Sequence, residues 1–123
     1  MADRKQALQD LRDKVAACDG MGAGIIARIM ASEARDAGRL FPAHDIHKAF
    51  YGSLDAALAL HNAVLPEFGW SIYEEENGEF LSLVSHKAQP KNHAENWAAT
   101  PARAWLLSII EALISETPKG DTP

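Results

Sequence analysis

Apolar residues recur at helical spacing in four segments of the chain and at strand spacing around one Asn-Gly pair. The first helix is predicted over residues 4–17, where Leu8, Leu11, Val15 and Cys18 fall on one stripe. Because this stripe is apolar, we expect Cys18 to pack in the core and not to act as a nucleophile.

The second predicted helix follows Asp19-Gly20-Met21-Gly22 and stops near Gly38. Gly20 is a suitable residue to end the first helix. The Gly20-x-Gly22-x-Gly24 spacing also occurs in phosphate-binding loops, but those follow a strand, whereas a helix precedes it here. We therefore predict a tight turn between two helices. The apolar residues of the second helix are Ile25, Ile26, Ile29, Met30 and Ala34.

Residues 38–50 contain Pro42 and a polar cluster, and they predict a loop, with a short strand before Tyr51 as an open alternative. Ser53 then has the position of an N-cap, and Asp55 lies in the first turn, where the helix dipole favours a carboxylate. Pro66 ends this third helix. Its expected buried face contains Leu54, Leu58, His61 and Leu65.

Asn77-Gly78 is the preferred pair for a two-residue type I′ turn and lies between two strand-like runs. A turn at this position pairs strand residues whose numbers sum to 155. The predicted pairs are Trp70 with Ser85, Ile72 with Leu83, Tyr73 with Ser82 and Glu76 with Glu79. Both faces of this hairpin carry apolar side chains, so we expect both faces to be covered.

Residues 98–114 predict the last helix, which begins with Thr100 as N-cap and Pro101 at the first helical position. Its body is apolar nearly all round, so neighbours must cover most of its sides. The exceptions form a narrow stripe of Ala104, Ser108, Glu111 and Ser115. The preceding residues 85–99 are polar and predict a loop, with a short edge strand near Trp97.

These elements predict an α+β fold in which a small antiparallel sheet, containing the hairpin, is sandwiched between helical layers. We expect one domain over residues 1–115 and a flexible tail over residues 116–123. The chain has 123 residues and a formal net charge of -5, which disfavours binding to duplex nucleic acid. Its single cysteine excludes an internal disulfide and a thiolate metal cluster. The N-terminal residues do not form a signal peptide, and we find no membrane-spanning run, so we expect a cytoplasmic protein with no membrane partner.

Short motifs in the second half of the chain occur in a characteristic order. Ser53-Leu54-Asp55-Ala56-Ala57 opens one helix, Gly69-Trp70 begins a strand, and Ala99-Thr100-Pro101-Ala102 opens the last helix. In this order the motifs resemble those of the phage ABA-sandwich domain family. The resemblance covers residues 51–113. It implies an antiparallel sheet between two helical layers and a phage origin, and it assigns no reaction.

The loop before the last helix provides the leading candidate site. The free N–H groups and the positive dipole end of a helix favour anions, and nearby cations and aromatic rings would suit a nucleotide. The candidate residues are Tyr73, Lys87, Lys91, His93, Trp97, Thr100 and Arg103. The alternative is a solvated loop whose lysines balance the acidic residues Glu74, Glu75, Glu76 and Glu79.

His44, Asp45 and His47 have a spacing seen in metal sites, and His61 and His93 could only join them if the fold brought them close. We predict no metal and no cofactor. No spacing of Ser, His and acid suggests a catalytic triad, and the hairpin carboxylates lie beside an exposed turn, so we expect no enzymatic activity.

We therefore expect a non-enzymatic accessory binding protein that counters a host defence, and the resemblance implies that it is phage-encoded. Its partner would be a small anionic ligand, such as a nucleotide-type signal, or a host protein. The alternatives are a virion or assembly component and a metal-dependent enzyme that uses His44 and His47. Homo-oligomerisation is also expected, because the last helix and both hairpin faces offer much apolar surface.

Overall fold

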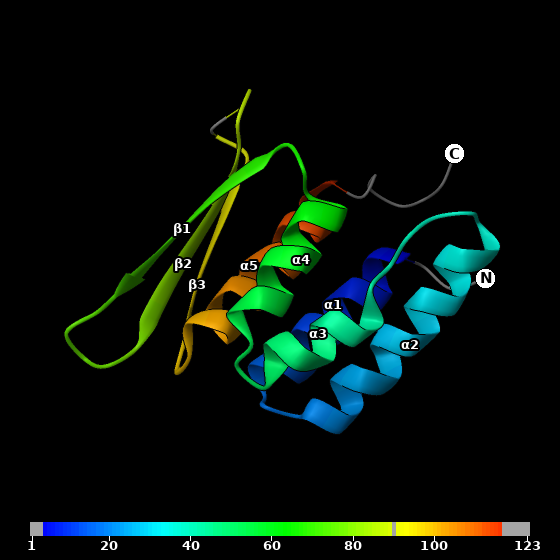
Figure 1. Cartoon of the computed structure of the whole chain (residues 1–123), viewed down its shortest axis with the longest axis horizontal. Coiled ribbons are helices and arrows are strands. Elements are labelled where there is room, and N and C mark those ends of the chain that lie inside the picture. Colours follow the sequence, from blue (N-terminus) through cyan, green and yellow to red (C-terminus); the bar gives the residue numbers. More distant parts are fainter. Residues whose placement is uncertain (1–3, 90, 117–123) are drawn as a thin grey trace.

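The computed structural model describes residues 4–89 and 91–116, which form helices and a three-stranded sheet (Figure 1). In chain order the elements are α1 (Arg4–Ala16), α2 (Gly20–Asp36), α3 (Ala43–Phe50), α4 (Leu54–Val64), β1 (Phe68–Glu74), β2 (Phe80–His86), β3 (His93–Ala98) and α5 (Pro101–Glu116). Most of the tail predicted at residues 116–123 lies outside the described residues.

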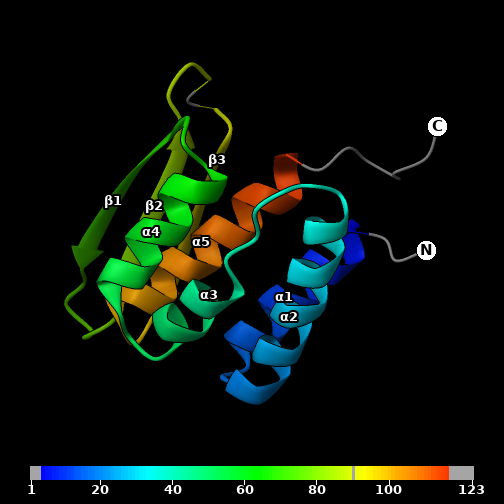
Figure 2. The same ribbon diagram turned by 45° about the vertical axis from the view of Figure 1, so that its right-hand side comes forward.

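The sheet is antiparallel with the strand order β1-β2-β3, and the described helices all lie on the same side of it (Figures 1 and 2). Helix α5 packs directly against β2 and β3, and α1, α3 and α4 cover its other sides. Helix α2 forms the outermost layer against α1 and α3. The predicted α+β class, with a hairpin-containing sheet packed against helices, is confirmed. Within residues 4–89 and 91–116 the layers run sheet, helices, helices, and no helix covers the second face of the sheet. The predicted sandwich between two helical layers, with both hairpin faces covered, is therefore wrong in this detail.

Helix α5 is the central buried element, as its apolar sequence predicts. The backbone N–H of Arg103 donates to the Oγ1 of Thr100 at 3.2 Å, so Thr100 is the N-cap, and Pro101 is the first helical residue. Along the helix, nearly every side chain from Ala102 to Ile114 is buried. Residues of this helix contact both the sheet and the helical layer behind it.

The narrow polar stripe of α5 faces the sheet. The Ser108 hydroxyl, fully buried, donates to the Ser82 carbonyl of β2 at 3.2 Å. The Asn96 amide of β3 donates to a Glu111 carboxylate oxygen at 2.6 Å. These bonds satisfy polar groups that would otherwise be costly beneath a sheet, and they fix the rotation of α5 under the strands.

The connection between α1 and α2 is a tight helix–helix turn, as predicted, but two details of the prediction are wrong. Gly20 does not end α1. It is the first residue of α2, where an added Cβ would lie 2.7 Å from the Phe50 ring. Instead Cys18 adopts the left-handed conformation, with φ of 60°, and its side chain is exposed and not in the core. The carboxylate of Asp19 caps α2 by accepting from the Gly22 N–H at 2.9 Å.

The predicted apolar face of α2 is only partly correct: Met30 and Ala34 are buried, whereas Ile25 and Ile29 are exposed. Its buried residues are Ala23, Ala27, Met30 and Ala34. Ile25 and Ile29 are about half exposed, because they lie off the stripe with which α2 packs against α1 and α3.

The loop or strand predicted for residues 38–50 is wrong, since this segment contains α3. The buried residues of α3 follow the helical spacing i, i+3 and i+4 within a helix of only eight residues; they are Ile46, Ala49 and Phe50. The Ser53 cap of α4 is confirmed, because its hydroxyl accepts from the Ala56 N–H at 3.1 Å. The expected face of α4 is only partly correct: His61 and Leu65 are buried, whereas Leu54 and Leu58 are exposed.

The β1–β2 hairpin forms, but its register differs by one residue from the prediction. The observed partners include Trp70–Val84, Ile72–Ser82 and Tyr73–Leu81. The difference arises at the turn, where the Glu75 N–H donates to the Glu79 carbonyl at 2.8 Å and the Gly78 N–H donates to the Glu75 carbonyl at 3.0 Å. The loop therefore has three residues, with Gly78 in the left-handed region at φ of 87°. A strand near Trp97 is present as β3.

The turn geometry makes Gly78 sensitive to substitution. We expect Gly78→Ala to lower the free energy of unfolding by about 1 kcal/mol, because alanine is strained at this positive φ. Gly69→Ala in β1 is the matched control, since a Cβ there meets only the Ser85 carbonyl oxygen, at 4.0 Å. Urea unfolding of both variants measures the difference. Equal stability of the two would contradict the assigned turn.

Candidate functional site

The residues of the predicted anion site fall into separate groups in the structure and do not form one site. Lys87, Lys91 and His93 lie at the end of the sheet where β2 passes to β3, whereas Thr100 and Arg103 follow the opposite end of β3. A six-residue strand spans roughly 17 Å, which separates the two groups. One small anion therefore cannot contact both the lysines and the α5 N-terminus.

Arg103 already interacts with the protein's own groups. Its guanidinium donates to the Phe50 carbonyl at 3.2 Å and to the Cys18 sulfur at 3.1 Å, and it stacks 4.5 Å from the centre of the Phe50 ring. These contacts join the start of α5 to the ends of α1 and α3. The geometry indicates a structural role for this side chain.

The loop between β2 and β3 is organised by His86. Its Nδ1 accepts from the Ala88 and Gln89 N–H groups, both at 3.1 Å, and its Nε2 lies 3.6 Å from a Glu67 carboxylate oxygen. Lys87 and Lys91 are exposed around this turn. The arrangement agrees with the alternative of a solvated loop, while the role of these lysines in binding stays a prediction.

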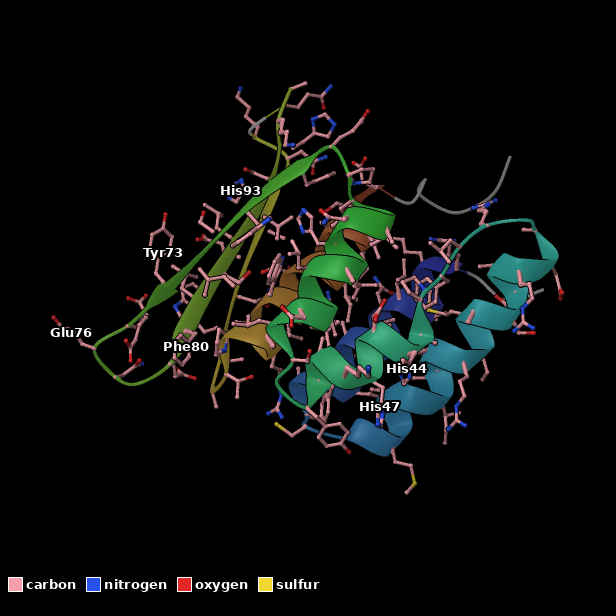
Figure 3. The ribbon with its side chains drawn as sticks, in the orientation of Figure 1. His44, His47, Tyr73, Glu76, Phe80 and His93 are labelled. Atoms are coloured by element: carbon pink, nitrogen blue, oxygen red, sulfur yellow. The ribbon has the colours of Figure 1, made fainter. Side chains whose placement is uncertain are left out.

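His44 and His47 both lie on α3 and line a hollow of about 340 Å³ together with Arg28. His93 lies far from them, at the sheet (Figure 3), and His61 is buried under β1. Among residues 4–89 and 91–116, no three His, Cys, Asp or Glu side chains gather in a way that could hold a metal ion. The cationic Arg28 beside the two histidines is also unfavourable for a metal.

His61 forms a buried hydrogen-bonded link between α5, α4 and β1. The Trp105 indole N–H donates to His61 Nδ1 at 3.1 Å, so Nε2 carries the proton and donates to the Phe68 carbonyl at 2.8 Å. Burial lowers the pKa of His61 below its usual 6.5; the hydrogen bond to Phe68 opposes this shift, and the charge of Lys87 adds to it. The neutral tautomer is therefore the one that the fold requires.

This link makes stability depend on pH. Because the pKa of His61 is lowered in the folded state, its contribution is complete above pH 6.5 and decreases as the pH falls below 6.5, where the unfolded chain takes up the proton first. His61→Leu should remove this component of the pH dependence. It should also destabilise the protein by about 2 kcal/mol at neutral pH, since Trp105 and Phe68 lose their partner.

The comparison uses denaturant unfolding at several pH values from about 5 to about 8, which bracket the ordinary pKa of histidine. His93→Asn is the control, because His93 is exposed and its ring makes a local hydrogen bond with the Lys91 carbonyl. A His61→Leu variant whose stability follows the pH as steeply as the parent protein would contradict the assignment.

The face of the sheet that points away from the helices, here called the outer face, carries a row of large side chains. Tyr73 pairs with Leu81, and Leu81 pairs with Trp97, so the three lie side by side across β1, β2 and β3. Tyr73 and Trp97 are 54% and 50% exposed, and no helix of the described residues lies over them. The Trp97 indole N–H donates to a Glu75 carboxylate oxygen at 3.3 Å. We call Tyr73, Leu81 and Trp97 the aromatic row.

Tyr73 and Trp97 were predicted from the sequence as stacking residues for a nucleotide, whereas Leu81 and the outer face were not predicted as part of a surface. The correct register was the missing information. In the predicted register Tyr73 faces Ser82, whereas in the structure it faces Leu81. When the register shifts by one residue, each side chain of β1 lies beside the other alternating set of β2 side chains.

A second apolar surface lies beside β1, in a groove of about 330 Å³. Its walls are Leu54 and Leu58 of α4 and Trp70 and Ile72 of β1. The Trp70 ring packs 4.3 Å from the Trp105 ring, which lies beneath it. We call this hollow the α4–β1 groove, and it was not predicted from the sequence.

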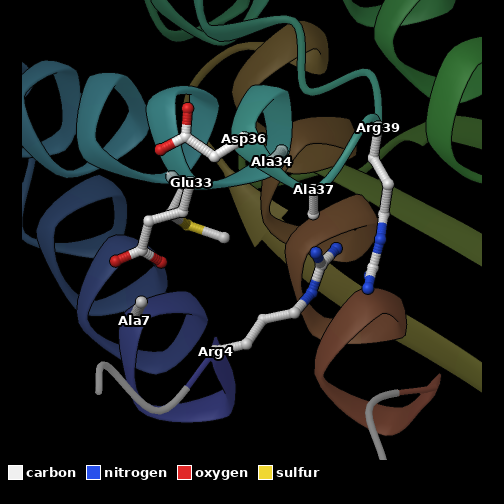
Figure 4. Close-up of a pocket in the computed structure, with 8 residues that line it drawn as sticks. Arg4, Ala7, Glu33, Ala34, Asp36, Ala37 and Arg39 are labelled. Atoms are coloured by element: carbon white, nitrogen blue, oxygen red, sulfur yellow. The ribbon is translucent and has the colours of Figure 1, made fainter.

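A third hollow, of about 630 Å³, lies between α1 and the end of α2 (Figure 4). Side chains of both charges line it, with Arg4 and Arg39 on one side and Glu33 and Asp36 on the other. The mixed charge gives it no clear preference for an anion or a cation.

Comparison with known proteins adds no assigned role to these surfaces. No protein-family model, curated protein or solved structure matches this chain. Among the described residues, no helix is both long enough and apolar enough to cross a bilayer. The geometry and chemistry of the exposed surfaces are therefore the basis for a function.

Proposed function

We propose that this chain is a non-enzymatic, phage-encoded accessory protein that counters a host defence by binding a host protein. The observation that carries the proposal is the aromatic row on the outer face. Large aromatic side chains are favoured at protein interfaces, because they bury much area for little loss of conformational entropy. The order of the motifs at Ser53 and Thr100 supports the phage origin.

Charge on the outer face favours a basic partner. Glu95 lies on this face beside Trp97, and Glu75 accepts the hydrogen bond from Trp97, so carboxylates border the aromatic row. The chain as a whole has a net charge of -5. A host protein with an apolar patch surrounded by Lys and Arg would therefore be steered to this face and held on it.

Other candidates for the function have less support from the geometry. A nucleotide-type signal would need Lys87 and Arg103 at one site, and β3 separates them. A metal-dependent enzyme would need a further ligand near His44 and His47, where Arg28 lies instead. A virion or assembly role would use the same outer face. The identity of the bound protein distinguishes this role from the proposed one.

The aromatic row provides a direct test. Affinity capture from host lysate with the parent protein should enrich a partner that the Tyr73→Ser/Trp97→Ser double variant does not enrich. Calorimetry with that purified partner should then show binding weakened by roughly tenfold or more, because two apolar contacts are lost. Leu40→Ser, which truncates a 70% exposed leucine away from the sheet, should leave binding unchanged.

Two results would contradict the proposal. One is a partner that binds the double variant as tightly as the parent protein. The other is a captured protein that is a structural component of the virion, which would favour the assembly role.

Homo-oligomerisation stays a separate prediction. We expect the apolar outer face to promote self-association as protein concentration rises, because exposed apolar area is unfavourable in water. Light scattering over a wide concentration range measures it, and the Tyr73→Ser/Trp97→Ser variant should shift the distribution toward monomer. A strict monomer at every concentration would exclude it.

A further inference from the structure

The sheet is too narrow to cover both helices that lie next to it. Helix α5 is covered by β2 and β3, whereas α4 lies next to α5 near the β1 side. As a result Leu54 and Leu58, on the side of α4 that lines the α4–β1 groove, remain 45% and 38% exposed. A further strand beside β1 would cover these two leucines.

The main chain of β1 is also available on that side. The Glu75 N–H donates to the Glu79 carbonyl. Because main-chain groups alternate in direction along a strand, the N–H and carbonyl groups of the odd-numbered residues of β1 point toward β2. The N–H and carbonyl groups of Trp70, Ile72 and Glu74 therefore point to the open edge. Among the described residues, no strand pairs with this edge.

The edge lacks the features that usually protect a sheet from further pairing. From Phe68 to Tyr73 the strand contains no proline and no charged residue. Natural proteins commonly blunt exposed edges with lysine, proline, bulges or a covering element. The Phe68 N–H and carbonyl are already bonded, to Leu65 and His61, so the open part of the edge is residues 70–74. An open edge beside an apolar groove is typical of a site that accepts an added strand.

Charge distinguishes between the possible occupants. Asp55 is the charged side chain among the described residues that line the groove, and Glu67 and Glu74 lie at the two ends of β1. A second copy of this chain, paired through its own β1, would bring these carboxylates close to their counterparts. A segment with basic residues on either side of an apolar centre would instead complement them.

We propose that the open edge of β1 binds an extended segment of another protein as a fourth, antiparallel strand. Alternate apolar side chains of this segment enter the α4–β1 groove against Leu58 and Trp70, and flanking Lys or Arg residues meet the acidic ends of β1. This site lies on a different surface from the aromatic row and does not depend on the function proposed above.

The test uses the synthetic peptide Lys-Thr-Val-Thr-Ile-Thr-Lys, in which both lysines, the valine and the isoleucine share one face. Amide hydrogen exchange followed by NMR should show new protection at Trp70, Ile72 and Glu74 when the peptide binds. Ser71 and Tyr73 should not change, because their N–H groups already bond to β2. This alternation is specific to strand addition.

Matched controls separate strand addition from unspecific binding. Methylating the valine and isoleucine nitrogens of the peptide, or replacing its lysines with glutamates, should weaken binding by roughly tenfold or more. Leu58→Glu should weaken it to a similar degree, while Leu40→Glu, at an exposed site elsewhere, should not. The Tyr73→Ser/Trp97→Ser variant should keep the alternating protection, so failure here is distinguishable from failure of the proposed function.

The proposal is overturned if the peptide does not bind up to its solubility limit or if protection at the edge does not alternate. Binding that survives both nitrogen methylation and Leu58→Glu also overturns it. Protection of Trp70, Ile72 and Glu74 that rises with protein concentration and without peptide would assign the edge to a second copy instead.

Discussion

The requirement to bury α5 on all sides organises this protein. A helix with so few polar positions is stable in water only when other elements surround it, and here the sheet covers one side and three helices cover the rest. Polar links fix its orientation within that shell. Ser108 bonds to the carbonyl of Ser82 in the sheet, and Trp105 bonds to His61, which in turn bonds to Phe68.

The same requirement explains where apolar surface remains exposed. Three strands are enough to cover α5, but they leave α4 partly uncovered, and with every described helix on one side they leave the outer face open. The aromatic row and the α4–β1 groove are therefore consequences of one asymmetric arrangement. Exposed apolar surfaces of this kind are typical of sites that bind a partner.

Local signals in the sequence predicted most of the elements. The Ser53 and Thr100 caps, the strongly apolar α5 and the hairpin around Asn77-Gly78 depend on neighbouring residues, and the structure contains all of them. Helix α3 was missed because Pro42 and several polar residues obscured a stripe of only three buried side chains. The residues predicted to form one anion site are close along the chain but not in space, because β3 lies between Lys87 and Arg103.

The sequence by itself determined the α+β class, the helix starts and the need to surround α5, because capping, periodicity and apolar content act over a few residues. Only the tertiary structure decided the register of the hairpin, the side of the sheet on which the helices lie and the exposure of Leu58 and Trp97. The physical reason is that each of these depends on contacts between distant segments. A one-residue change in the turn decides whether Tyr73 lies beside Leu81, and no local pattern specifies that choice.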